Sequence, residues 1–286
     1  MRDLHNLAMQ LISQIRALLL IATVASAEDA GQRIDITLAS DFKAPPANVS
    51  AVLNSAAESI WRHCPSTRWQ TPGFEVFLSP DYPIAAFDHR ANGRIAIGVT
   101  TTGTYWSQYA FQFSHEFAHA LAGHANDWRK PWIREKRANH WLEESICETA
   151  SLFALRAMAE SWRTHPPYPN WRDYAQSLRN YADDRLRETE RTLPANANFI
   201  RWLAANESSM RSNSVQREKN NVVARHLLPV FERTPSGWEA VTFLNLGKRR
   251  DPNLTLSQHL ADWREAAPPK HRAFIEEVAR TLGARL

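Results

Sequence analysis

The sequence predicts an α+β fold, in which a small N-terminal mixed sheet with one helix precedes an all-helical C-terminal lobe. Short runs of alternating apolar residues occur before residue 100, whereas apolar residues recur at helical spacing from about Ser107 onward. The pair Asn92-Gly93 between two such runs is typical of a hairpin turn, because both residues tolerate positive φ. We expect one lobe over residues 28–124 and a second over residues 125–286, as suits a chain of 286 residues.

The first 27 residues have the pattern of a secretory signal peptide. Arg2 and Arg16 precede an apolar run over residues 17–25, and Ala25-Ser26-Ala27 supplies small residues for cleavage after Ala27. The run is shorter than the roughly 20 apolar residues that a membrane span needs. We therefore expect an exported protein, periplasmic or secreted, without a membrane anchor after cleavage. The alternative is an amphipathic N-terminal helix that is retained.

The predicted elements follow in order along the chain. Alternation predicts strands over 33–38, 74–78, 84–87 and 94–99, and helical spacing predicts a helix over 49–63. The helix that begins near Ser107 ends near Gly123. Further helices are expected over 142–163, 170–192, 196–205, 215–232, 255–266 and 269–283, since prolines break the pattern between most of them.

Charge and cysteine content restrict the function classes. The net charge of +4 is the difference between 34 basic and 30 acidic residues. The basic residues are spread along the chain, which is not the clustered pattern of a nucleic-acid-binding protein. Export would allow Cys64 and Cys147 to form a disulfide, because oxidising compartments preserve such bonds. Two separately buried thiols are equally compatible with the sequence.

The helix that begins near Ser107 carries the motif His115-Glu116-Phe117-Ala118-His119. Residues i and i+4 lie on one face of a helix, so His115 and His119 can reach one ion, and Zn²⁺ suits two imidazole nitrogens. Glu116 lies beside the open position of such an ion, where it can accept a proton from water. The flanking residues are apolar, and burying these polar groups without partners would be costly.

Two candidates compete for the third metal ligand. His124 lies nine residues after His115, but a continuing helix would place it on the opposite face. There it would interact favourably with the negative C-terminal end of the helix dipole. Glu144 and Glu148 lie four residues apart, on one face of the next helix. Glu143 is an alternative to Glu144, although an acidic first turn is ordinary in helices. Cys147 is expected to pack in the core.

The combination of His-Glu-x-x-His with Trp141-Leu142-Glu143-Glu144 resembles the gluzincin zinc peptidases, which include thermolysin-like enzymes. The resemblance implies a zincin-like fold with His115, His119 and Glu144 as Zn²⁺ ligands. It also implies that Glu148 orients His115 by accepting its other ring N–H. In such enzymes an edge strand of the sheet holds an extended substrate, and Ile95–Val99 is similar to that strand.

Two features depart from the gluzincin pattern. The Gly-x-Met-Glu-Asn motif that holds a free amino terminus in the large aminopeptidases is absent, so nothing indicates exopeptidase action. Gluzincins also place a tyrosine or histidine against the developing oxyanion, and the corresponding helix here offers His226 as a substitute, with Tyr174 and Tyr181 as further candidates.

The segment from Trp128 to Arg137 lies between the two ligand helices and carries Arg, Lys and Trp residues. We expect it at the rim of a cleft, either as a solvated basic loop or as a recognition element for a carboxylate.

The sequence as a whole predicts an exported zinc metallopeptidase that cleaves a peptide or protein substrate, with Glu116 as the base. One alternative is a non-catalytic exported zinc-binding or inactive peptidase-like protein. Another is a zinc hydrolase that acts on a non-protein amide such as a cell-wall cross-link.

Overall fold

The computed structural model of the chain describes residues 34–65, 73–86, 90, 92–123, 139–249 and 251–286. Residues 34–286 form one unit. The predicted signal peptide, His124 and the segment from Trp128 to Arg137 lie outside the described residues.

A four-stranded mixed sheet forms the N-terminal part, as predicted. Strands β1 (Ile36–Leu38), β2 (Phe74–Leu78), β3 (Ile84–Ala86) and β4 (Ile95–Val99) lie in the order β1-β2-β4-β3. The β1–β2 and β2–β4 pairs are parallel, whereas β3 is antiparallel to β4, with Ala85 opposite Ile97. Gly93 has φ 75°, as the Asn-Gly turn predicts.

The expectation that Ile95–Val99 forms the edge strand is wrong. This segment is β4, which pairs with β2 on one side and β3 on the other. All five of its residues are buried, which is typical of a central strand whose apolar run is nearly continuous. The antiparallel edge beside it is β3, a strand of three residues.

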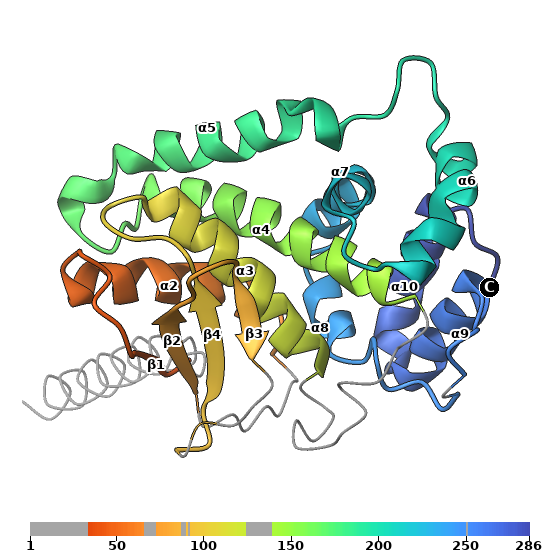
Figure 1. Ribbon diagram of the computed structural model, residues 1–286, viewed down its shortest axis with the longest axis horizontal. Helices are drawn as coiled ribbons and strands as arrows, with labels where there is room; N and C mark the ends of the chain where they lie inside the picture. The colour runs from red at the N-terminus through yellow and green to blue at the C-terminus, as the bar shows by residue number, and fades with distance from the viewer. Residues whose placement is uncertain (1–33, 66–72, 87–89, 91, 124–138, 250) are drawn as a thin grey trace, which may run out of the picture. The chain divides into compact units, whose positions relative to one another are not determined.

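Helices α2 (Pro46–Trp61) and α3 (Trp106–Gly123) cover the sheet (Figure 1). Phe74 of β2 packs against Phe113 and Phe117 of α3, with ring centroids 6.3 and 5.5 Å apart. These contacts fix α3 on the sheet through the apolar side chains that flank its two histidines.

The C-terminal part is helical, as predicted, and α4 (His140–Trp162) is its central element. Helix α4 packs against α3, α5 and α7 (Figure 1). The predicted helix over 170–192 is shorter, because 3₁₀ turns at Pro169–Trp171 and Thr189–Arg191 flank it. The helices after α4 are α5 (Tyr174–Arg187), α6 (Phe199–Ser212), α7 (Arg217–Arg233), α8 (Gly237–Val241), α9 (Leu256–Ala266) and α10 (Arg272–Thr281).

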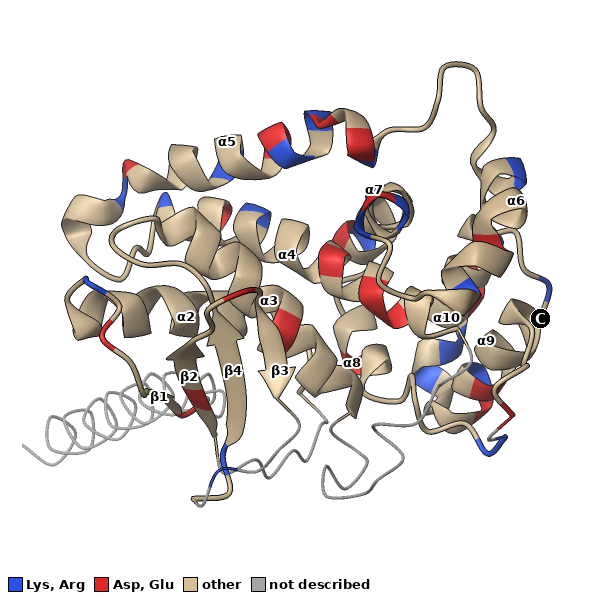
Figure 2. Ribbon diagram, in the orientation of Figure 1, with Lys and Arg blue, Asp and Glu red and all other residues tan. Residues whose placement is uncertain are grey.

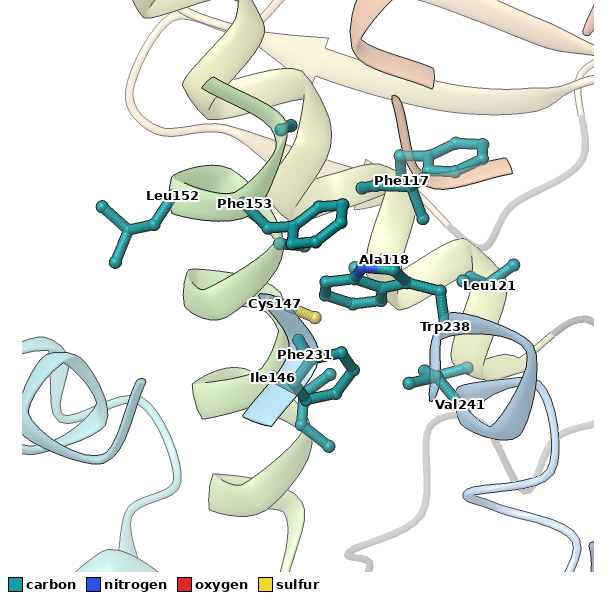
Figure 3. Packing of buried hydrophobic residues seen from close by; sticks show 14 of the residues in the cluster. Phe117, Ala118, Leu121, Ile146, Cys147, Leu152, Phe153, Phe231, Trp238 and Val241 are labelled. Carbon is teal, nitrogen blue, oxygen red and sulfur yellow. The ribbon is translucent and has the colours of Figure 1, made fainter. Parts of the chain in front are cut away.

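The short helix α8, which the sequence did not predict, completes the core beside α3 and α4. Figure 3 shows Trp238 of α8 among Phe153 of α4, Phe231 of α7 and the sulfur of Cys147. Trp238 and Cys147 are fully buried. Cys147 therefore packs in the core as expected, and both it and Cys64 are free thiols. No helix within the described ranges combines the length and the apolar character that crossing a membrane requires.

Candidate metal centre

Helices α3 and α4 bring the predicted ligands together. His115 and His119 lie one turn apart on α3, and Glu144 lies in the second turn of α4. Glu144 Oε2 lies 3.5 Å from His115 Nε2 and 3.6 Å from His119 Nε2. Two donors on one tetrahedral zinc lie about 3.3–3.6 Å apart, given metal–ligand bonds of about 2.0–2.2 Å. The spacing of Glu144 from each imidazole therefore suits a shared cation.

The start of α4 is fixed by a residue just outside the helix. Asn139 has φ 55°, a left-handed conformation that asparagine tolerates better than most residues. Its buried side chain donates to the carbonyl oxygen of Leu254 at 2.8 Å and accepts from Arg211 at 3.2 Å. These contacts determine where the first turn of α4 begins and hence where Glu144 points.

The other ring nitrogen of each α3 histidine faces a second carboxylate of α4. His119 Nδ1 lies 2.8 Å from Glu143 Oε1, and His115 Nδ1 lies 3.8 Å from Glu148 Oε1. Glu148 therefore faces the other ring nitrogen of His115, as predicted, but at a distance too long for the predicted hydrogen bond. Glu143 emerges as the partner of His119, a role that the sequence analysis did not assign. Such contacts orient ligating imidazoles and fix their tautomers.

Both of these carboxylates have further partners from remote segments. Asn245 donates to Glu143 Oε2 at 2.7 Å. Arg191, which is 3 % exposed, lies 3.3 Å from Glu148 Oε2 and donates to Asn221 at 2.7 Å. Arg191 thus holds the carboxylate that faces His115.

The electrostatics of the cluster favour a cation. Glu116, Glu143, Glu144 and Glu148 are all less than 10 % exposed, and the last three lie close together in the N-terminal half of α4 (Figure 2). Burial alone would lower the pKa of His115, but contact with Glu144 and the charges of Glu116 and Glu148 raise it. Burial opposes ionisation of Glu144 as well, yet the two imidazoles hold its pKa well below the ordinary range.

Two groups of donor atoms are compact enough to surround one ion. One ring nitrogen each of His115 and His119 lies with Cys147 Sγ within 4.8 Å, and so do donors of His119, His140 and Glu144. His115, His119 and Glu144 do not form such a group as a set, although Glu144 is close to both histidines. Imidazole, carboxylate and thiol donors are those that Zn²⁺ binds, so the donor chemistry fits the predicted ion.

Glu116 lies on α3 beside His115 and is 5 % exposed. Within the described part of the chain, no side chain or backbone group hydrogen-bonds to its carboxylate. Its charge nevertheless acts on His115.

The predicted oxyanion donor is not part of this cluster. His226 Nδ1 lies 2.8 Å from the carbonyl oxygen of Val222, and its ring stacks on Phe199 with centroids 3.8 Å apart. Tyr174 contacts Ser107 at the opposite end of α3, and Tyr181 packs against Phe111. None of the three contacts the cluster through the described residues.

The sequence analysis overlooked His140, the first residue of α4. Its Nε2 lies 3.6 Å from Glu144 Oε1 and 3.7 Å from Glu143 Oε1. The spacing of three and four residues to these glutamates is itself a signal, because it places all three side chains on one helix face. Arg191 and Asn245 have no comparable local signature.

Comparisons with protein-family models, with curated proteins and with solved structures found no match to this chain. The resemblance to gluzincin peptidases therefore stays a prediction. The function of the cluster has to be inferred from the donors themselves.

Proposed function

We propose that this chain is an exported zinc-dependent hydrolase of zincin-like, gluzincin type that cleaves amide bonds in peptides or proteins. The observation that carries the proposal is the convergence of His115 and His119 on Glu144, at 3.5 and 3.6 Å. The support of each imidazole by a second carboxylate, Glu148 or Glu143, strengthens it.

The roles of the residues follow from their positions. His115, His119 and Glu144 would hold Zn²⁺, which when bound supplies Lewis acidity and lowers the pKa of a coordinated water toward about 7. Glu116 would serve as the general base and acid of the reaction, taking up a proton at its carboxylate and giving it to the leaving amine nitrogen. The low exposure of Glu116, His119 and Glu144 strengthens the electrostatic interactions among them.

The edge strand β3 supports a peptide as the substrate class. An extended chain can add to a sheet edge by backbone pairing, and β3 is the antiparallel edge of this sheet. Helix α3 packs against β3, so the edge and the helix that carries the two histidines are neighbours.

The test combines metal analysis with cleavage of a peptide library by the purified protein and by Glu116→Gln. Loss of the base is expected to lower the cleavage rate by about 10²–10⁴-fold while bound zinc stays near one per chain. Glu160→Gln is the matched control, because Glu160 is an exposed helical glutamate outside the cluster. Undiminished cleavage by Glu116→Gln would refute the proposed base.

A non-catalytic zinc-binding role is the second candidate. It is favoured by the positions of His226, Tyr174 and Tyr181, none of which contacts the cluster in the described structure. Stoichiometric zinc with no cleavage of any library peptide would support this role. Export is tested separately: the N-terminus of the protein recovered from the periplasm or medium is expected to be Glu28.

A further inference from the structure

His140 has the contacts of a metal ligand, although neither the His-Glu-x-x-His pattern nor the proposed ligand set includes it. Its side chain is 29 % exposed, and its Nε2 lies 3.6 Å from Glu144 Oε1. The ring centroids of His119 and His140 are 6.3 Å apart. His140 thus borders the cluster beside Glu144 and His119.

A hydroxyl from a distant segment orients the His140 ring. Ser214 Oγ lies 3.2 Å from His140 Nδ1, which leaves Nε2 directed at the glutamates. His115 and His119 show the same arrangement, with Nδ1 on a polar partner and Nε2 toward Glu144. Metal-ligating histidines characteristically have their second nitrogen held in this way.

The donors of His119, His140 and Glu144 all lie within 4.8 Å of one another. Three atoms so placed have a common point within about 2.8 Å of each. Zinc–nitrogen bonds are about 2.0–2.1 Å long, so side-chain shifts below about 1 Å would bring all three donors to bonding distance of an ion at that point. We infer that His140 is a third imidazole donor to the same divalent cation that His119 and Glu144 hold. The inference rests on the proposed function and extends its ligand set.

A fourth protein donor is compatible with hydrolysis. Zinc can take five ligands, so a site made of His115, His119, His140 and Glu144 would leave room for a water. His140 is also the most exposed of the three histidines, at 29 % against 17 % for His115 and 10 % for His119.

The test replaces zinc by Co²⁺ and counts the imidazoles bound to it. In the proton NMR spectrum of the Co²⁺-loaded protein in water, each ligating histidine contributes one strongly shifted, exchangeable N–H signal. Three signals are expected from the wild type and two from His140→Gln. His165→Gln is the matched control, because His165 is exposed beyond the end of α4, and it is expected to keep all three signals.

Competition with a chelator gives a second, independent measurement. His140→Gln is expected to weaken Co²⁺ binding at least about tenfold, and Ser214→Ala is expected to weaken it by less while three shifted signals remain. Unchanged affinity of His140→Gln would contradict the assignment. The wild-type signal count needs no variant and so does not depend on how any variant folds.

The remaining outcomes separate this inference from the proposed function. Two shifted signals from the wild type that both persist in His140→Gln would overturn the role of His140 and leave the ligands His115, His119 and Glu144 intact. A sulfur-to-cobalt absorption band that disappears in Cys147→Ser but persists in Cys64→Ser would place the ion in the other donor group and overturn it too. Failure of the wild type to bind Co²⁺ or Zn²⁺ would overturn both proposals.

Discussion

His115 and His119 each use their two ring nitrogens differently, and this division underlies the centre. Nε2 of both rings faces Glu144, whereas Nδ1 faces Glu148 in one case and Glu143 in the other. The hydrogen bond between His119 Nδ1 and Glu143 favours a proton on Nδ1, which leaves Nε2 of that ring with a lone pair for a cation. Two neighbouring turns of α4 thus supply both the carboxylate that the two imidazoles share and the carboxylates at their other ring nitrogens.

Arg191 is expected to be essential for stability, because it compensates the buried charge of Glu148. Arg191→Met would leave that carboxylate without its cation, and removal of one partner from a buried pair costs about 3–5 kcal/mol of unfolding free energy. Urea denaturation measures the loss. Arg187→Met is the control, since Arg187 is 72 % exposed, and a change within about 0.5 kcal/mol is expected. Equal losses in both variants would contradict the role of Arg191.

His271 is expected to make the protein less stable in mild acid. It is 3 % exposed, and burial together with the charge of Lys270 lowers its pKa against the opposing effect of Glu239. Because the folded pKa is below the ordinary 6.5, the contribution of neutral His271 is complete above that pH. It is lost as the pH falls from 6.5 toward the folded pKa, since the unfolded chain takes up the proton first.

Denaturation of the wild type and of His271→Gln at pH 7.5 and about pH 5.5 measures this effect. The variant is expected to lose less unfolding free energy between the two pH values than the wild type. The comparison is a difference between two proteins with the same His115 and His119, so the titration of these two histidines cancels. An equal pH dependence of both proteins would refute the assignment.

At the scale of single elements, periodicity predicts the type of most helices and strands. The apolar spacing around His115 and around Glu144 predicted α3 and α4 nearly to their ends, because long amphipathic or apolar segments carry strong signals. Helix α8 has only five residues and gives no periodic signal. The central position of β4 in the sheet depends on its pairing with β2, and the order of residues along β4 does not encode that pairing. The burial of all five residues of β4 is nevertheless typical of a central strand.

Helix α4 is expected to depend on Asn139 for its starting point. Asn139→Ala has two destabilising effects. The left-handed backbone conformation is unfavourable for alanine by about 1–2 kcal/mol, and the hydrogen bonds to Leu254 and Arg211 are lost. Asn139→Gly keeps the backbone conformation and loses only those bonds. We therefore expect the alanine variant to melt at a lower temperature than the glycine variant, and both below wild type. The reverse order would show that the backbone conformation is not what matters.

At the scale of the whole molecule, the supporting residues come from segments far apart in the chain. Arg191, Ser214 and Asn245 lie 43, 74 and 102 residues from the side chains they contact. No local pattern marks them, since their roles arise only when the helices pack. The two donor helices were therefore predictable from sequence, whereas the groups that orient the donors were not.

Metal removal is expected to destabilise the fold, because the ion would link α3 to α4. Zinc at about 100 times its dissociation constant adds about 2.7 kcal/mol to the unfolding free energy. For a chain of this size that shifts the melting temperature by roughly 5–10 °C. Calorimetry with zinc and with a chelator measures the shift. A His115→Ala, His119→Ala double variant is expected to show none, and an identical melting temperature of the wild type in both conditions would contradict a linking ion.

The three-residue length of β3 limits what this edge of the sheet can accept. At about 3.3–3.4 Å per residue, Ile84–Ala86 offers roughly 10 Å of backbone for a guest strand. So short an edge strand offers little backbone for pairing with another copy of the chain, because long, flat edge strands are the ones that promote aggregation. For the same reason, a bound peptide would form backbone hydrogen bonds with β3 over only a few residues. Recognition of the rest of the peptide would have to come from side chains of the protein.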